Sequence, residues 1–206
     1  MRFVKTFVYS VLGGICIGIG GTALLSAESK IAGALFFTVG LFVICTFGFL
    51  LFTGKVCYVF ANDLSYAANL PVIWLGNFSG AWLTGTTLRI TRVSALAEKA
   101  ASMCQVKLSD SLVSVFLLAI LCNILIFVAV DGYRNNPHEL GKYLSLFLGV
   151  TVFIICGFEH CVANMFYLSV AGMWSGKAFV FLLVNTLGNA VGGVMIPLLQ
   201  RLTKLD

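Results

Sequence analysis

The chain has 206 residues and a formal net charge of +5, and 60% of its residues are hydrophobic while only 10% are charged. A soluble domain carries about 25% charged residues, so this sequence is excluded from that class and predicts an integral membrane protein, in keeping with its mean hydropathy of +1.02. The basic residues form no run along the chain, which argues against nucleic-acid binding.

Charge-poor stretches predict six membrane spans, because about 20 apolar residues cross a bilayer core. In chain order they are residues 6–27, 31–54 with an extension to about 62, 64–88, 111–130, 143–176 and 178–200. The first could pass for a signal peptide, but its apolar run is too long and no convincing cleavage site follows, so we interpret it as a span. Between the third and fourth spans, the Ala-rich residues 94–104 predict a short interfacial helix.

Two of the predicted spans are too long for one straight helix. Residues 143–176 would give a helix of about 51 Å and residues 31–62 one of about 48 Å, against a hydrocarbon core of about 30 Å. A helix that breaks near the midplane resolves both cases, and open backbone at that depth needs protein or a water-lined cavity around it. Two breaks in corresponding positions indicate a transport site.

The two halves of the sequence correspond. Residues 48–54 align with 157–163 at a shift of 109 positions, and residues 76–80 align with 188–192 at a shift of 112. Because the duplicated unit has three spans, its second copy must enter the membrane inverted. We therefore expect an all-α membrane protein with six transmembrane helices, arranged as an inverted 3+3 repeat with two broken helices. Its single transmembrane domain, residues 1–206, comprises repeat one (about 4–93), an interfacial connector (about 94–107) and repeat two (about 108–203).

Glu159 and His160 are the only carboxylate and the only histidine well inside a predicted span. Ionisable groups in a membrane cost several kcal/mol unless they are partnered, so both are functional candidates. For Glu159 we favour an anchor for amides exposed at the helix break, and for His160 a role in the pore, where an imidazole suits proton exchange. A second histidine is missing from the spans, so no metal or haem cofactor is expected.

Three segments resemble the formate/nitrite transporter family. Residues 157–166, which read GFEHCVANMF, look like the family signature nearly letter for letter. Residues 51–54 (LFTG) resemble its first broken-helix motif, and residues 188–193 (GNAVGG) resemble its last-span motif. The resemblance runs from about Lys5 to the C-terminus.

This resemblance implies an aquaporin-like protomer that assembles as a homopentamer in the lipid bilayer of the cell membrane, with one anion pore per protomer. Members carry formate, nitrite, hydrosulfide, acetate or lactate, often with a proton. The pore and substrate residues implied are the central histidine His160, the facing Thr53, the polar Asn123, and the apolar constrictions of Leu51 on one side and Phe153 and Ile126 on the other. Lys5 and Lys107 match vestibule lysines, one at each mouth, although snorkelling at a helix end explains either lysine equally well.

Four residues are expected to support the broken helices: Glu159, Asn164, Asn77 and Asn189. Three features depart from the family pattern. Leu50 replaces a residue that is usually acidic or polar, so the first loop could be anchored differently. Lys55 adds a positive charge just after Thr53, which we interpret as a snorkelling lysine rather than an attractor of anions. The sequence is also shorter than typical members at both ends, which puts gating by an N-terminal helix in question.

The function we expect is transport of small monovalent weak-acid anions, proton-coupled through the central pore histidine His160, with formate or nitrite favoured, and not catalysis. The anion takes its proton from water in the vestibule or through His160. Hydrosulfide, acetate or lactate stay open as alternatives within the family. An aquaporin-type channel for neutral solutes should carry Asn-Pro-Ala at both breaks, and this sequence has none. An intramembrane enzyme using Glu159 and His160 would need more polar groups at that depth than Thr53 and Asn123.

Overall fold

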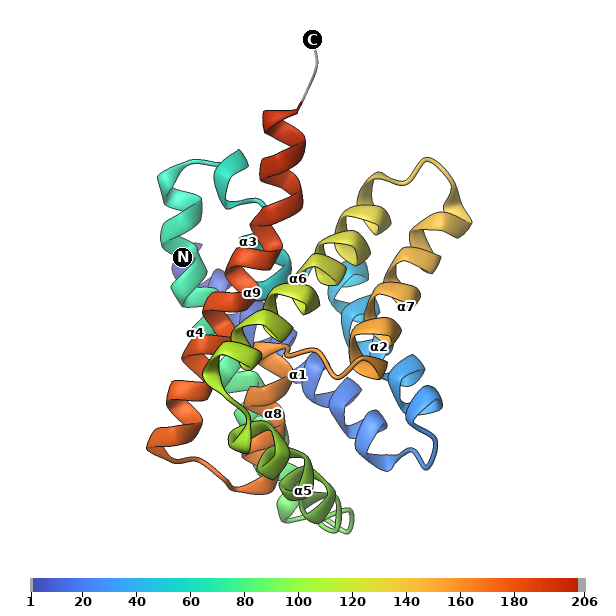
Figure 1. Cartoon of the computed structure of the whole chain (residues 1–206), viewed down its shortest axis with the longest axis vertical. Helices are drawn as coiled ribbons and strands as arrows, with labels where there is room; N and C mark the ends of the chain where they lie inside the picture. The colour runs from blue at the N-terminus through green and yellow to red at the C-terminus, as the bar shows by residue number, and fades with distance from the viewer. Residues whose placement is uncertain (1, 204–206) are drawn as a thin grey trace.

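The computed structural model describes residues 2–203, and its regular elements in that range are helices (Figure 1). They are α1 (Arg2–Ser26), α2 (Lys30–Phe47), α3 (Phe52–Val56), the 3₁₀ turn η1 (Val59–Ala61), α4 (Leu64–Arg89), α5 (Leu96–Ser109), α6 (Leu112–Asn135), α7 (Glu139–Ile155), α8 (Cys161–Ala171) and α9 (Gly176–Leu202). Four of these helices, α1, α2, α6 and α9, are long and apolar enough to cross a membrane.

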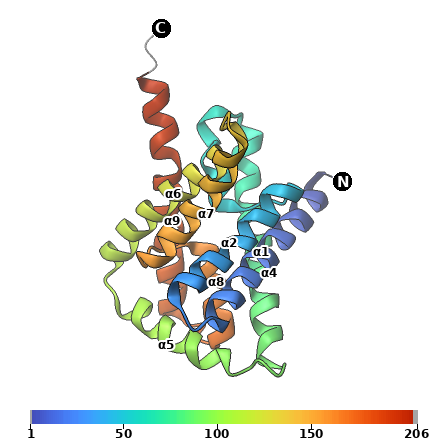
Figure 2. The same cartoon turned by 90° about the vertical axis from the view of Figure 1, so that its right-hand side faces the viewer.

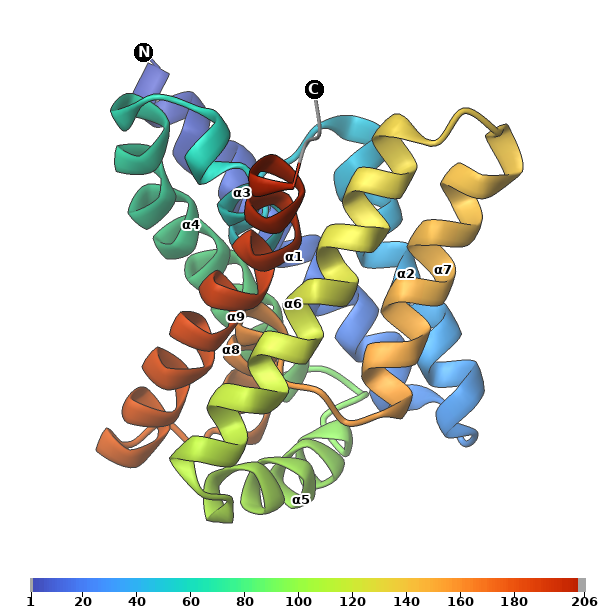
Figure 3. The same ribbon diagram turned by 45° about the horizontal axis from the view of Figure 1, so that its top comes forward.

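Helix α1 packs against α4, and α6 packs against α9 in the same way. Helices α2 and α7 lie side by side, and α8 contacts both α4 and α5 (Figure 1). Helix α5 lies across one end of the bundle, whereas the connection between α6 and α7 lies at the other end (Figures 2 and 3). The helix expected at residues 94–104 is thus α5, which continues to Ser109.

Both over-long stretches of the sequence stop being helical partway along. After α2, Gly48 adopts φ 70° and the chain then extends until α3 begins at Phe52. After α7, Gly157 adopts φ 72° and the chain extends until α8 begins at Cys161. A positive φ is open to glycine at little cost, so these two glycines let the chain leave each helix and start the next in a new direction.

Glycines in α4 and α9 allow close contact with the preceding partner helix. A Cβ at Gly80 would lie 2.8 Å from the backbone nitrogen of Ile15 in α1. A Cβ at Gly192 would lie 2.8 Å from the carbonyl carbon of Ile120 in α6, and closer still to its oxygen. Backbone cannot move aside as a flexible side chain can, so the α1–α4 and α6–α9 contacts both depend on glycine at these positions.

We predict that Gly192→Ala destabilises the protein by about 1–3 kcal/mol, because the added methyl group overpacks the contact with α6. The readout is the melting temperature of the purified protein in detergent. Gly176→Ala, at the start of the same helix with open space around its Cα, is the control and should melt at or slightly above the wild-type temperature. Equal melting of the two variants would contradict this account of the packing.

Candidate functional site

One asparagine of α4 holds the loop between α2 and α3. The buried Asn77 accepts a hydrogen bond from the Phe52 N–H (2.8 Å) and donates to the carbonyls of Ser10 (2.7 Å) and Leu50 (2.8 Å). The N–H of Leu50 donates to the carbonyl of Tyr9 at 3.1 Å. Leu50, which stands where an acidic or polar residue was expected, is therefore anchored through its main chain.

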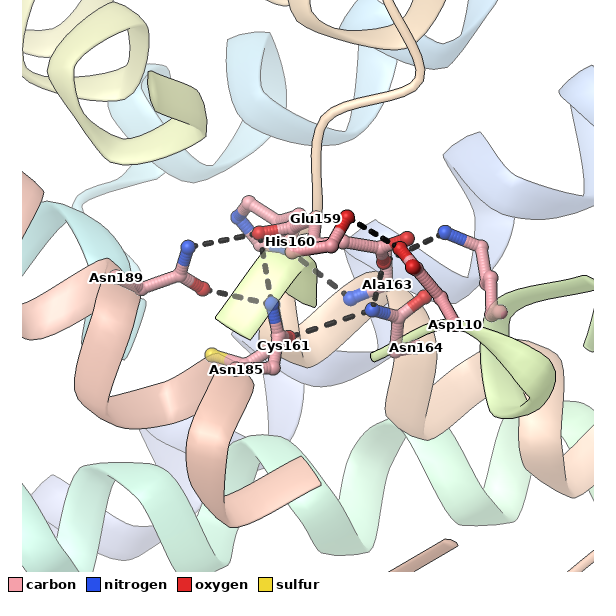
Figure 4. A network of polar contacts seen from close by, with 10 residues as sticks. Asp110, Glu159, His160, Cys161, Ala163, Asn164, Asn185 and Asn189 are labelled. Carbon is pink, nitrogen blue, oxygen red and sulfur yellow. Dashed lines mark hydrogen bonds and ion pairs between the residues drawn. The ribbon is translucent and has the colours of Figure 1, made fainter. Parts of the chain in front are cut away.

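One asparagine of α9 holds the loop between α7 and α8. The buried Asn189 accepts from the Cys161 N–H (2.8 Å) and donates to the carbonyls of Ala119 and Glu159, both at 2.8 Å (Figure 4). The N–H of Glu159 donates to the carbonyl of Leu118 at 3.4 Å.

The two sets of hydrogen bonds match partner for partner. Each main-chain partner in the second set lies 109 positions after its counterpart in the first, and the two asparagines lie 112 positions apart. The pairs are Tyr9 and Leu118, Ser10 and Ala119, Leu50 and Glu159, Phe52 and Cys161, and Asn77 and Asn189. These are the shifts at which the sequence segments align, so the aligned residues have the same bonding roles.

The Glu159 side chain ties the second loop to α5. Its Oε2 accepts from the ammonium of Lys107 at 2.6 Å and from Asn164 Nδ2 at 2.7 Å (Figure 4). Asn185 donates to the Glu159 carbonyl at 2.9 Å and accepts from Asn164 at 3.3 Å. Asn185 was not among the site residues predicted from the sequence. It could have been found as a second amide in an apolar span, four residues before Asn189 and thus on the same helix face.

His160 begins α8 and reaches toward α3. Its Nδ1 accepts from the Ala163 N–H at 3.1 Å, which caps the helix, and its Nε2 lies 3.0 Å from Thr53 Oγ1. Because Nδ1 is an acceptor, the neutral ring carries its proton on Nε2, which donates to the threonine hydroxyl. The Phe153 ring stacks on the imidazole, with centroids 5.7 Å apart and an interplanar angle of 16°.

Asn123 and Ile126, one turn apart on α6, are both buried. Asn123 Nδ2 donates to the Thr53 carbonyl at 3.1 Å, and Asn123 Oδ1 has no hydrogen-bond partner among residues 2–203. That oxygen is a buried acceptor with unused capacity next to the threonine that His160 contacts.

Two cavities lie on opposite sides of these buried groups. The larger, of about 630 Å³, is lined by His160, Phe153, Lys107 and residues of α1 and α5. The smaller, of about 50 Å³, is lined by Leu51, Lys55 and Arg134. Thr53 is buried and lines neither cavity, and Leu51 is buried in the wall of the smaller one.

The two lysines expected at the mouths differ in their surroundings. Lys107 lines the larger cavity and is paired with Glu159. Lys5 is exposed, its ammonium lies 5.5 Å from the centroid of the Tyr9 ring, and it lines neither of these two cavities.

An apolar helical bundle in which two helix starts meet between two cavities has the architecture of a membrane channel or transporter. The chain belongs to the formate/nitrite transporter family, whose model matches residues 1–202, and it is an integral membrane protein. Members and structural neighbours are channels and transporters rather than enzymes, so the alternative of an intramembrane enzyme is not retained.

Several transporters and a solved channel structure are similar to this chain. The formate channel FocA of Haemophilus influenzae is 27% identical, over 97% of this chain and 87% of that protein. The uncharacterized transporter YrhG of Bacillus subtilis is 30% identical, over 81% of this chain and 68% of that protein. A solved pentameric formate channel with formate bound superposes with a TM-score of 0.81 at 26% identity, covering 100% of this chain and 98% of the other.

We predict that Asn77→Ala destabilises the protein by about 2 kcal/mol or more, because it leaves the Phe52 N–H and the Leu50 carbonyl without this partner at about 1–3 kcal/mol each. The Ser10 carbonyl keeps its place in the hydrogen-bond ladder of α1. The matched control is Asn69→Ala on the same helix, since Asn69 donates only to the Ser65 carbonyl in a less buried place. Melting temperatures in detergent would compare the two. If both variants melted like the wild type, Asn77 would not be what holds the loop.

Proposed function

We propose that this protein transports small monovalent weak-acid anions, with formate or nitrite as the leading candidates, along a passage that runs past His160. The observation that carries the proposal is the buried contact between His160 and Thr53, with one cavity on each side. The similarity to formate channels, one of them with formate bound, supports the choice of anion.

The proposed architecture has six spans: α1, α2 with α3, α4, α6, α7 with α8, and α9. They form one domain of two inverted repeats, about residues 4–93 and 108–203, joined by a connector of about residues 94–107. The matched hydrogen bonds of Asn77 and Asn189 support this duplication. We propose a homopentamer in the cell membrane, supported by the similarity in fold to a solved formate channel that is pentameric.

The proposed passage favours the neutral acid over its anion, because removing water from a charge costs more free energy. Lys5 and Lys107 would raise the local anion concentration at the two mouths. An anion would then meet apolar rings, Leu51 on one side and Phe153 with Ile126 on the other, where losing its water costs far more than for a neutral molecule. An apolar surrounding favours the neutral form of a weak acid, so the anion crosses as the uncharged acid.

The proton comes from water in a vestibule rather than from His160. To relay a proton, the ring would have to carry one on Nδ1 while that nitrogen faces the Ala163 N–H, and two donors would then oppose each other. In this proposal His160 is a fixed donor through Nε2–H, and Thr53 offers its hydroxyl beside it. Asn123 Oδ1 would accept the O–H of the neutral acid. Glu159 and Asn164 support the loop that presents the histidine.

Hydrosulfide, acetate and lactate remain alternative substrates. A flux panel of formate, nitrite, hydrosulfide, acetate and lactate in proteoliposomes, compared with swelling in an uncharged solute, tests the function itself. Uptake of at least one weak acid should accelerate at acidic outside pH, because the protonated fraction grows about tenfold per pH unit well above the acid's pKa. Swelling in the neutral solute without any anion flux would overturn the proposal in favour of an aquaporin-type channel.

Two substitutions separate the structural role of His160 from its role in transport. His160→Asn keeps an oxygen that can cap α8 but removes the ring, so we expect wild-type melting and at least a tenfold loss of formate flux. His160→Phe should lose flux and also be less stable by about 1 kcal/mol, the typical worth of such a cap. The control is His138→Asn, at the exposed start of α7. Wild-type formate flux in His160→Asn would count against the proposed role.

A further inference from the structure

The smaller cavity has two cations in its wall. Lys55, in the last turn of α3, and Arg134, in the last turn of α6, both line it together with Leu51. Within residues 2–203 the ion pairs are Lys107 with Glu159 and Lys142 with Glu139. Neither Lys55 nor Arg134 is therefore neutralised by a carboxylate in the described part of the chain.

The nearby acid, Asp131, forms no ion pair with either cation among residues 2–203. Asp131 Oδ1 accepts from the Tyr58 hydroxyl at 3.0 Å and from Asn135 Nδ2 at 2.9 Å, and Asp131 does not line the cavity. Arg134 lies over the Tyr58 ring, 5.3 Å from its centroid. The ring positions the guanidinium by a cation–π contact but leaves its charge in place.

The two cations act on the same small space. Lys55 and Arg134 both interact electrostatically with Cys45, which also lines the cavity, and Arg134 interacts electrostatically with Lys55. Two like charges in a partly buried place repel each other, and an anion between them relieves that repulsion. A cavity with low-dielectric walls and charge of one sign concentrates counter-ions.

We propose that Lys55 and Arg134 form an anion-binding site in the smaller cavity, immediately behind Leu51, that holds a small monovalent anion before or after it passes the constriction. The inference rests on the proposed transport function and adds a site at the end of the bundle opposite α5. At the larger cavity Glu159 offsets the charge of Lys107, while Lys30 and Lys99 also line that cavity and donate to the carbonyls of Ile155 and Leu25. Both cavities therefore carry lysines that are not paired with a carboxylate among the described residues.

The cavity has room for a small anion. It measures about 50 Å³, whereas a single water needs about 10–15 Å³ on the same measure. Formate and nitrite, with three heavy atoms each, therefore fit in it.

The test measures initial formate flux in proteoliposomes against formate concentration. Lys55→Gln and Arg134→Gln should each raise the half-saturating concentration about three- to tenfold, the size expected for removing one partly screened charge near a bound anion. Lys55→Arg keeps the charge and should stay within about twofold of the wild type. The control is Lys142→Gln, whose ammonium lies at the same end of the bundle but pairs with Glu139 and lines neither cavity.

The difference between the glutamine variants and the wild type should shrink at about 1 M salt, where charges are screened beyond about 3 Å. If the wild type moves none of the anions, the proposed function fails and the site fails with it. If the wild type conducts but both glutamine variants keep its half-saturation and salt dependence, the site alone is wrong. Should Lys55→Gln fail to assemble, the exposed Arg134 carries the test by itself.

Discussion

Backbone groups that are left open where a helix stops inside an apolar bundle must find partners within the protein, and this constraint governs the arrangement of the whole molecule. Asn77 and Asn189 each satisfy two such groups, one N–H and one carbonyl of a loop, and each also donates to a carbonyl within α1 or α6. Because both loops are fixed in this way, the first turns of α3 and α8 face each other, and the Thr53 hydroxyl reaches the His160 ring.

The same constraint gives His160 two roles through its two nitrogens. Nδ1 caps α8 by accepting the Ala163 N–H, so the proton of the neutral ring lies on Nε2. The start of the helix therefore determines which hydrogen bonds the ring can make. The two loops differ in their further support. Glu159 ties its loop to α5 through Lys107, whereas Leu50 has only main-chain bonds. The two loops thus share a pattern of main-chain hydrogen bonds but differ in the charges beside them.

Much of this arrangement follows from the sequence, because span length and residue alignment are local properties. The excess length of residues 31–62 and 143–176 predicted that neither stretch is one straight helix. The aligned glycines Gly48 and Gly157 both adopt a positive φ, and the aligned asparagines make matching hydrogen bonds. The partner of Lys107 could not be predicted, since it lies 52 positions away across a loop whose path depends on α5. The place of Arg134 beside Lys55 could not be predicted either, because only the fold brings the end of α6 against α3.

The central claim is that two interrupted helices leave a narrow passage with the imidazole of His160 at its waist. An experimental structure of the assembled protein in lipid, at a resolution that resolves ordered water or formate, tests this most directly. The account predicts that the ring lies beside Thr53, between the two cavities, with solvent or anion density leading toward it from both ends. A ring that points into lipid, or that is packed in a solid core with no opening alongside, would contradict it.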